Sequence, residues 1–256
     1  MKRPPASRAD PRKGRRKRYS VNRKRLALSF LLLLLVGEFV FAALTSPVFS
    51  IKRVKVMGNR MVPASEVVRR LNLPANTCIF RIDKQAMAGR VCENPVIKRV
   101  TLHRALPRTL VVRVTERRPD FLLKTSAGVY EVDSSSVPFR LVDKVDARLP
   151  VIECGLPRRP VLGRKLTGST LNSARKCLLL AREKKSLRVA KITVDQNNDL
   201  CLNVRDGFEV RLGRPEQLSK KLDIAAQSVE QIPELRQRGE YLDVTCPDAP
   251  AMKVRD

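Results

Sequence analysis

The chain has 256 residues, enough for one or two modest domains together with a tail and a membrane anchor. Its 52 Lys and Arg residues against 25 acidic residues give a net charge of +27. A single histidine and no Cys-x-x-Cys pair argue against a zinc site, and the sequence has neither a glycine-rich phosphate loop nor an HExxH motif. We therefore expect a non-enzymatic protein without catalytic residues, metal, cofactor or small-molecule substrate.

Residues 1–25 are strongly basic, with twelve Lys and Arg residues against Asp10 alone. The segment also contains Pro4, Pro5, Pro11 and Gly14 and almost no apolar side chains. Because such a segment cannot bury a core, we expect a disordered tail. By itself it could bind nucleic acid, contact anionic lipid or act as a topology signal.

The next segment decides between these readings. Residues 26–46, LALSFLLLLLVGEFVFAALTS, have the length and composition of one transmembrane helix. A basic block before such a span keeps the N-terminus in the cytoplasm, which places the rest of the chain outside it and away from nucleic acid. A cleaved signal peptide fits poorly, because the basic and apolar runs are too long and Ser46-Pro47 replaces a small-x-small site.

Glu38 is the unusual residue of this span, since a carboxylate is costly within a bilayer. Two interpretations remain open. Glu38 either contacts a partner's transmembrane helix or lies far enough toward the outer side to reach the interface.

All six cysteines follow the span, where an oxidising compartment would permit disulfides with fifteen possible pairings. They could equally be small buried apolar side chains, and the sequence leaves this open. The six are Cys78, Cys92, Cys154, Cys177, Cys201 and Cys246.

Residues 48–119 predict a small α+β domain in the order strand, helix, helix, strand, strand. Residues 51–56 alternate as a strand before the Gly58-Asn59 turn, and Pro63 opens a short helix. A second helix is expected from Asp83, a good N-cap, to Cys92. The apolar stripe expected on the first helix consists of Val67, Val68 and Leu71.

Two further strands, residues 96–102 and 110–116, form a hairpin through the short link at 104–108. Their expected inward faces are Val96, Val100 and Leu102 on one strand and Leu110, Val112 and Val114 on the other. His103 lies on this hairpin among arginines, without a neighbouring Ser or Cys motif, so we expect a solvated side chain rather than a catalytic base. Two helices on one face of a three-stranded sheet complete the domain.

Residues 120–256 predict a mostly antiparallel β-domain with two helices. The helices are expected at 169–183, with Leu171, Ala174, Leu178 and Ala181 inward, and at 215–232, with Leu218, Leu222, Ala225 and Val229 inward. Strands are expected at 129–132, 190–195, 200–205, 208–212, 241–246 and 252–254. Asp206-Gly207 between two alternating runs is a strong hairpin signal.

The order of these pieces resembles the FtsQ/DivIB family of bacterial division proteins. Residues 51–73 look like the start of that family's POTRA domain. Pro95, Arg104, Pro107 and Glu116-Arg117-Arg118-Pro119 match its next motifs. Asp133 stands where the family has Asp before a Gly turn, although this chain has three serines there. Residues 149–155, the DGFEVRLG run at 206–213, Lys220-Lys221-Leu222 and residues 241–244 match the C-terminal part, with Thr245 where the family usually has Arg.

The resemblance implies a divisome scaffold in the cytoplasmic membrane at the division septum, a single-pass type II protein with most of its chain extracytoplasmic. It also implies partners of the FtsB/DivIC and FtsL kinds, bound by β-strand addition near the C-terminus. The surface implied for them contains Tyr241, Asp243, Thr245, Met252 and Val254. The alternative is a POTRA-containing membrane protein of envelope assembly or secretion without a division role.

Overall fold

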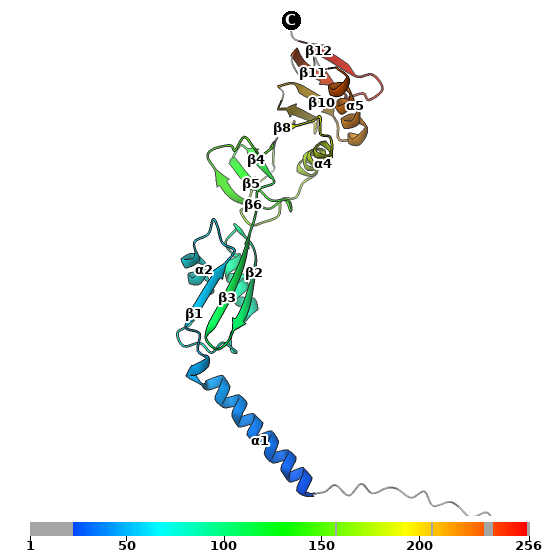
Figure 1. Cartoon of the computed structure of the whole chain (residues 1–256). Coiled ribbons are helices and arrows are strands. Elements are labelled where there is room, and N and C mark those ends of the chain that lie inside the picture. The colour runs from blue at the N-terminus through cyan, green and yellow to red at the C-terminus, as the bar shows by residue number, and fades with distance from the viewer. Residues whose placement is uncertain (1–22, 157, 206, 233–237, 255–256) are drawn as a thin grey trace, which may run out of the picture.

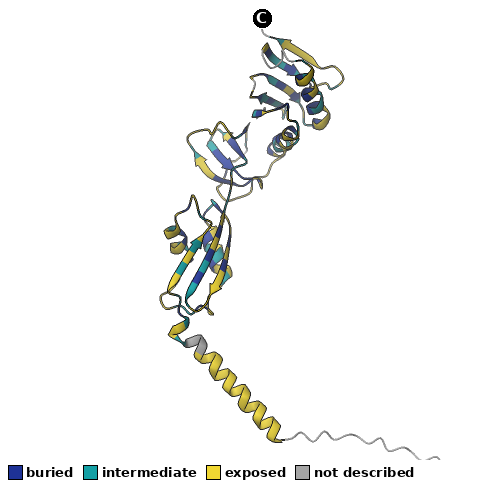
Figure 2. Cartoon of the chain, in the orientation of Figure 1, coloured by how far each residue is buried: buried dark blue, intermediate teal, exposed yellow. Residues whose placement is uncertain are grey.

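The computed structural model describes residues 23–156, 158–205, 207–232 and 238–254. Helix α1 (Arg23–Thr45) leads through the short 3-10 helix η1 (Pro47–Phe49) into the first folded domain (Figure 1). Residues Arg23–Ala42 are long and apolar enough to cross a membrane, and Figure 2 shows that α1 is exposed. The predicted span therefore corresponds to α1.

The predicted disordered tail, residues 1–25, lies outside the described residues except for its last three. These three, Arg23–Arg25, are helical. Arginine and lysine are good helix formers, so α1 can begin before the apolar run at residue 26.

The first domain has the predicted β-α-α-β-β order. Its elements are β1 (Arg53–Met57), α2 (Ala64–Leu71), α3 (Lys84–Cys92), β2 (Ile97–Ala105) and β3 (Thr109–Glu116). Strand β3 is central, parallel to β1 and antiparallel to β2. Both helices pack on the sheet and share one core with its inward side chains, including Leu71, Val91, Leu102, Leu110 and Val112. The Asp83 carboxylate caps α3 by accepting from the amides of Gln85 and Ala86.

Two details of this domain differ from the prediction. Val68 is 38% exposed, so the inward stripe of the two-turn helix α2 is Val67 and Leu71 alone. On β2, Ile97 and Val100 are both buried although they are three positions apart, because a shift in register between Ile97 and Arg99 inserts an extra residue. The bulge makes Ile97 the inward residue and leaves Val96 half-buried.

The second domain contains, within the described residues, a nine-stranded mixed sheet in the order β12-β11-β10-β9-β8-β7-β4-β5-β6. Its strands are β4 (Phe121–Thr125), β5 (Gly128–Val132), β6 (Pro138–Val142), β7 (Val151–Cys154), β8 (Val189–Val194), β9 (Leu200–Val204), β10 (Glu209–Gly213), β11 (Gly239–Asp243) and β12 (Ala251–Val254). The pairings β4–β7, β7–β8 and β10–β11 are parallel, and the remaining five are antiparallel.

Helices α4 (Ser169–Glu183) and α5 (Leu218–Gln231) pack against the strands through a single hydrophobic core (Figures 1 and 2). All eight side chains predicted to face inward from these helices are buried. Strands β4, β6 and β7 were not predicted individually. β6 lies in a stretch of turn-forming residues and begins at Pro138, a residue type that a strand tolerates at its start or at an edge.

The junction of the two domains is held by Arg117, just beyond the end of β3. Its Nε donates to the Pro95 carbonyl at 3.0 Å, and its Nη1 lies 2.5 Å from Oδ2 of Asp133, whose side chain is 3% exposed. Asp133 Oδ1 accepts from the amides of Ser135 and Val137 in the turn between β5 and β6. The turn forms without the family's glycine because Ser136 adopts a positive φ of 64°.

The six cysteines are all free in the described chain, so the structure has no disulfide there. Burial raises the pKa of the Cys154 thiol to about 11 and the pKa values of Cys177 and Cys201 to about 12. Cys154 and Cys177 are buried, as expected for small apolar side chains, whereas Cys92 and Cys246 are exposed.

Candidate partner-binding edge

Strand β12 ends the large sheet at the C-terminal side of the molecule, at the opposite end from α1 (Figure 1). Within the part of the chain that the structure describes, it pairs with β11 alone, antiparallel, with Leu242 opposite Met252 and Asp243 opposite Ala251. Among the described residues, none makes a hydrogen bond to its outer edge. An edge of this kind offers unpaired N–H and C=O groups to an incoming strand.

Tyr241 lies on β11, on the sheet face that carries Arg211. The guanidinium carbon of Arg211 is 3.9 Å from the centre of the Tyr241 ring, a cation–π contact. Arg211 Nε also donates to Glu209 Oε1 at 3.0 Å, and this hydrogen bond raises the pKa of Arg211. Arg211 therefore covers one face of the Tyr241 ring, and Tyr241 is half-buried. Neither Arg211 nor Glu209 was predicted as part of the surface, although both lie within the DGFEVRLG run.

Asp243 is the last residue of β11, and Thr245 follows it by two residues. The amide of Thr245 donates to Asp243 Oδ1 at 2.9 Å, so the carboxylate accepts from a backbone donor just beyond the end of the strand. The Thr245 methyl group would lie 2.7 Å from a Cβ at Gly213, whose φ is +61°. Glycine at position 213 therefore allows the end of β10 and the exposed Thr245 to lie side by side.

Met252 and Val254 occupy the edge strand itself. Met252 is 49% exposed and stands opposite Leu242, whose side chain is buried, so the two lie on the same face of the sheet. Lys253, between them, stands opposite Tyr241 and pairs with Glu240 at 3.0 Å. This ion pair raises the pKa of Lys253.

The structure thus brings all five predicted residues to one edge but divides them between its two faces. Tyr241 and Asp243 belong to the face with Arg211, and Met252 belongs to the face of Leu242. The side chains on the two faces have the backbone of β12 between them. Recognition at this edge would therefore combine backbone pairing with side-chain contacts on both faces.

Three other sheet edges are present in the described residues: β1 and β2 in the first domain and β6 in the second. The β6 edge begins with Pro138, whose carbonyl accepts from the amide of Gly163, so a loop covers part of it. Lys98 and Arg99 are exposed on β2, and Arg53 and Lys55 on β1. Charged side chains of this kind, lysine above all, protect edges from pairing. β12 carries one lysine, which is paired with Glu240.

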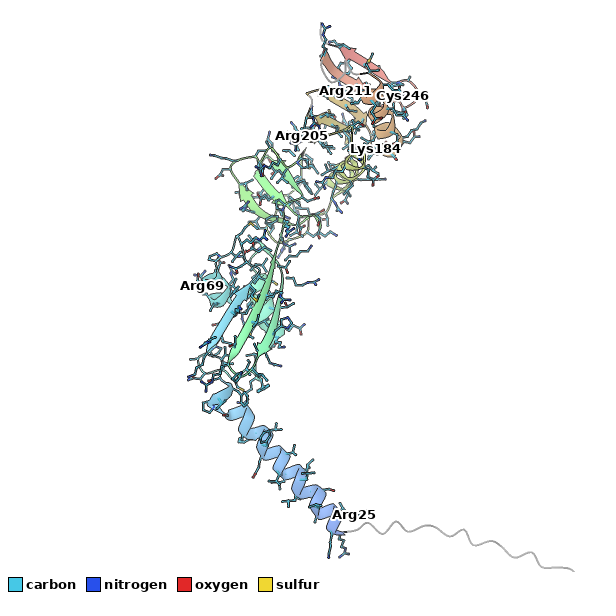
Figure 3. All side chains as sticks on the ribbon, in the orientation of Figure 1. Arg25, Arg69, Lys184, Arg205, Arg211 and Cys246 are labelled. Atoms are coloured by element: carbon cyan, nitrogen blue, oxygen red, sulfur yellow. The ribbon has the colours of Figure 1, made fainter. Side chains whose placement is uncertain are left out.

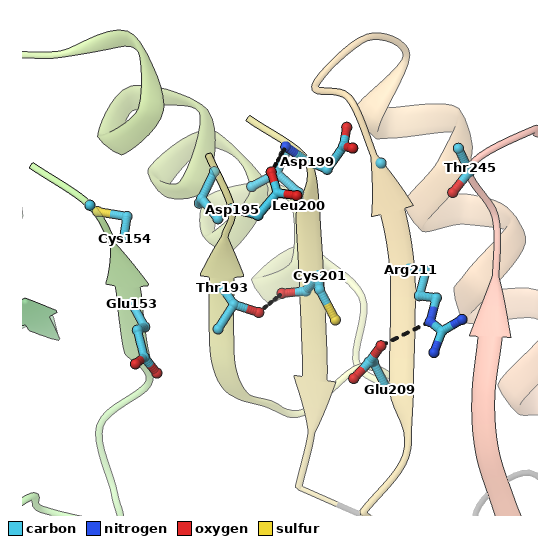
Figure 4. A pocket seen from close by; sticks show the side chains of 13 residues that line it. Glu153, Cys154, Thr193, Asp195, Asp199, Leu200, Cys201, Glu209, Arg211 and Thr245 are labelled. Carbon is cyan, nitrogen blue, oxygen red and sulfur yellow. Dashed lines mark hydrogen bonds and ion pairs between the residues drawn. The ribbon is translucent and has the colours of Figure 1, made fainter. Parts of the chain in front are cut away.

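A shallow pocket lies on the sheet face beside this edge (Figure 4), lined by Glu153, Thr193, Cys201, Glu209, Arg211 and Thr245 among others. Its two thiols, Cys154 and Cys201, have pKa values raised by burial to about 11 and about 12, which keeps both protonated. Glu153 is paired with Lys191 and Lys124, and those contacts lower its pKa. His103 is exposed on β2 of the other domain. No cluster of metal-binding residues occurs in the described parts of the chain.

Lys221 of α5 supports the edge from behind. It is 4% exposed, and its Nζ donates to the carbonyls of Leu212 at 2.7 Å and Arg214 at 2.9 Å. The Leu212 carbonyl lies within β10 and the Arg214 carbonyl directly follows it, so Lys221 ties α5 to the strand next to β11. The neighbouring Lys220 instead makes an exposed ion pair with Asp248.

Glu38, the candidate membrane contact, lies near the C-terminal end of α1, seven residues before Thr45. Its side chain is exposed on the isolated helix. It belongs to the apolar stretch Arg23–Ala42 and is remote in sequence from the β12 edge.

Comparison with known proteins gives two matches to family models. A model described as "POTRA domain, FtsQ-type" matches residues 49–117, and "Cell division protein FtsQ/DivIB, C-terminal" matches residues 122–245. The chain is 26% identical to a cell division protein FtsQ of Streptomyces collinus over 88% of this chain and 86% of that protein. It is 28% identical to FtsQ of Syntrophotalea carbinolica, over 72% and 66%, and 21% identical to DivIB of Clostridium tetani, over 87% and 86%.

Proposed function

Because this chain belongs to the FtsQ/DivIB family of cell-division proteins, we propose that it is a non-catalytic scaffold of the divisome. In this role it links early and late division proteins by binding FtsB/DivIC-like and FtsL-like partners. The family assignment carries the division role, and the proposed partners rest on the resemblance of the C-terminal motifs.

The observation that supports strand addition is the free outer edge of β12. It is flanked by Tyr241 held on Arg211 and by the exposed Met252. A partner segment pairing there would gain main-chain hydrogen bonds. It would also reach Tyr241 and Asp243 on one face of the sheet and Met252 and Val254 on the other.

The proposed location is the cytoplasmic membrane at the septum, with α1 as a single span. The twelve basic residues before the apolar stretch favour a cytoplasmic N-terminus, so both folded domains would be extracytoplasmic. Glu38 would then lie toward the outer side of the span, where it could hydrogen-bond to a partner's transmembrane helix.

A pull-down of the full chain in detergent with the extracytoplasmic segments of FtsB- and FtsL-like proteins tests the edge. Successive N–H groups of a strand point to its two opposite edges, so one of Met252→Pro and Lys253→Pro removes an outward donor. We expect both variants to lower capture, and the outward one to do so without loss of β11 pairing. The same pair of substitutions on the opposite edge, Leu141→Pro and Val142→Pro, is the matched control and should retain binding.

Capture that survives both β12 prolines would keep the scaffold role and move the interface elsewhere. Absence of any capture by the unmodified chain would favour the envelope-assembly alternative. Glu38→Leu, assayed with partners that retain their own membrane helices, should weaken capture only if Glu38 makes an intramembrane contact.

A further inference from the structure

The end of the first domain that adjoins α1 is built from three separate segments, which we call the collar: residues 46–53, 76–81 and 104–108. The first contains η1, the second lies between α2 and α3, and the third is the tip of the β2–β3 hairpin. Figure 1 shows this end of the domain next to the end of α1.

Backbone and side-chain hydrogen bonds tie the collar into one unit. The amide of Ile51 donates to Thr77 and that of Ile79 to Phe49, at 2.9 and 2.8 Å. Arg108 Nε donates to the Val48 carbonyl at 3.0 Å, which joins the hairpin tip to η1. Arg104 joins the hairpin tip to the segment 76–81 by donating to the carbonyls of Ile79 and Phe80 at 2.7 and 3.2 Å. The collar is therefore a preformed surface.

The collar exposes large apolar side chains. Leu106 is 60% exposed, Val48 47% and Phe80 37%, and Phe80 stacks edge-on against Phe49 with ring centres 5.3 Å apart. Each of the three segments contributes one of these exposed side chains. Apolar side chains gathered at one end of a domain are typical of a contact surface.

The same collar is purely cationic. It contains Lys52, Arg53, Arg81, Arg104 and Arg108, and none of its three segments contains Asp or Glu. None of these five cations forms an ion pair with any residue that the structure describes. Exposed apolar side chains together with unpaired cations complement an anionic lipid surface, where the apolar groups enter the headgroup layer and the cations contact phosphates.

The covalent connection places the collar at such a surface. The apolar stretch ends at Ala42, α1 ends at Thr45 and the collar begins at Ser46. A linker of a few residues spans at most about 3.5 Å per residue, so the collar cannot move far from the bilayer. This step rests on the membrane anchor of the proposed function.

We propose that the collar docks onto the anionic phospholipid surface of the membrane that α1 crosses. Leu106, Val48 and Phe80 enter the headgroup layer, and Lys52, Arg53 and Arg81 contact the phosphates. Arg104 and Arg108 hold the collar together. Docking fixes the tilt of the first domain relative to the bilayer, which a flexible linker would leave free.

Photocrosslinking of the full chain in nanodiscs tests the contact. Benzoylphenylalanine is placed at position 106 in the collar, at 141 on β6 as an exposed apolar control (Leu141 is 46% exposed), and at 39 within α1. The discs contain phosphatidylcholine alone or with phosphatidylglycerol. We expect lipid adducts at 106 and 39 but not at 141, with the yield at 106 rising when phosphatidylglycerol is present.

Lipid adducts at 39 without adducts at 106 would overturn the collar and leave the anchor standing. Absence of lipid adducts at both 39 and 106 would overturn the membrane anchor and, with it, the docking that depends on the anchor. A position-106 adduct that is equally strong with and without phosphatidylglycerol would overturn the anionic recognition.

A charge-removal variant sharpens the test. It retains Arg104 and Arg108, the two arginines that hold the collar together. With Lys52, Arg53 and Arg81 all changed to Gln, we expect the phosphatidylglycerol-dependent yield at 106 to fall about fivefold or more, because each cation near an anionic surface contributes to docking. The matched control removes three exposed cations from elsewhere in the same domain, with Arg69, Lys98 and Arg99 changed to Gln (Arg69 is labelled in Figure 3). An equal fall in this control would show a general charge effect and overturn the proposal.

Discussion

At the scale of single residues, Glu116 shows how a family motif acts through backbone chemistry. Its carboxylate ends β3 and accepts from three consecutive amides, Arg60, Met61 and Val62, at 2.9 to 3.0 Å. The loop between β1 and α2 would otherwise present these donors unpaired. Burial raises the pKa of Glu116, but the hydrogen bonds from the Val62, Met61 and Arg60 amides outweigh that effect, so its pKa is lowered.

Replacing Glu116 with Gln should lower the free energy of unfolding by about 1–3 kcal/mol, because charge-assisted hydrogen bonds become neutral ones and at least one amide loses an acceptor. Urea unfolding of the two folded domains at neutral pH measures the change. Glu93→Gln is the matched control, since Glu93 is exposed and follows α3. A loss of stability as large in the control would refute the role of the amide contacts.

The same carboxylate predicts a pH dependence. Because the folded-state pKa of Glu116 lies below its unfolded value of about 4.3, its contribution is fully present above that pH and is lost as the pH falls through the folded pKa. The stability difference between the unmodified protein and Glu116→Gln should therefore shrink on acidification below about pH 4. A difference that stays constant down to strongly acidic pH would contradict this assignment.

At the scale of elements, the candidate edge is supported by α5 as well as by its own strands. Lys221 is the only buried lysine among the described residues, and it donates to two carbonyls at the end of β10. Since β10 pairs with β11, which carries β12, this contact helps to set the position of the edge.

Lys221→Met should lower the free energy of unfolding by about 1.5–3 kcal/mol, because the buried Leu212 carbonyl and the part-buried Arg214 carbonyl lose a charged donor. It should also speed hydrogen exchange of the β11 amides. Lys220→Met, the adjacent substitution, breaks only an exposed pair with Asp248 and should cost no more than about 1 kcal/mol. Equal effects of the two substitutions, compared by denaturant unfolding and hydrogen exchange, would rule out the support by Lys221.

Much of this organisation is readable from periodicity, and the exceptions have physical causes. The long apolar runs predicted α4 and α5 with their inward faces, because a helical stripe repeats over several turns. Val68 was misassigned because a two-turn helix gives too short a repeat to locate its face. The bulge near Lys98 follows from the register between β2 and β3, and the strand that begins at Pro138 is defined by its pairing with β5 within a turn-rich stretch, so neither has a periodicity of its own.

The candidate edge was predictable only in part, for a similar reason. Tyr241 and Met252 could be placed on neighbouring strands, but their division between two faces follows from the register between β11 and β12. The contact of Arg211 with Tyr241 depends on parallel pairing across a helix, which no local pattern reveals.

At the scale of the whole molecule, the two domains are joined by a buried ion pair. Arg117 is 14% exposed and Asp133 3%, and each also bonds to backbone in its own domain. The two residues therefore do more than attract each other: they connect the loop that precedes β2 to the turn between β5 and β6.

Arg117→Met should lower the free energy of unfolding by about 3 kcal/mol or more, since it leaves the Asp133 carboxylate buried without its partner. Asp133→Asn keeps an oxygen for the turn amides, so the double variant Arg117→Met/Asp133→Asn should be less destabilised than the sum of the two single variants. Additive effects in this double-mutant cycle, measured by urea unfolding, would show that the pair contributes no coupling between the domains.

The firm junction has a geometric consequence for assembly. With α1 at one end and β12 at the other (Figure 1), a stiff connection at Arg117 would make the chain a spacer that presents the proposed docking strand at a set height above the bilayer. If a membrane-anchored partner binds there as proposed, it would need a stalk long enough to reach that height, and a helical stalk gains only about 1.5 Å per residue. The length of the stalk alone would then determine which partners can reach β12, before any side-chain contact contributes to specificity.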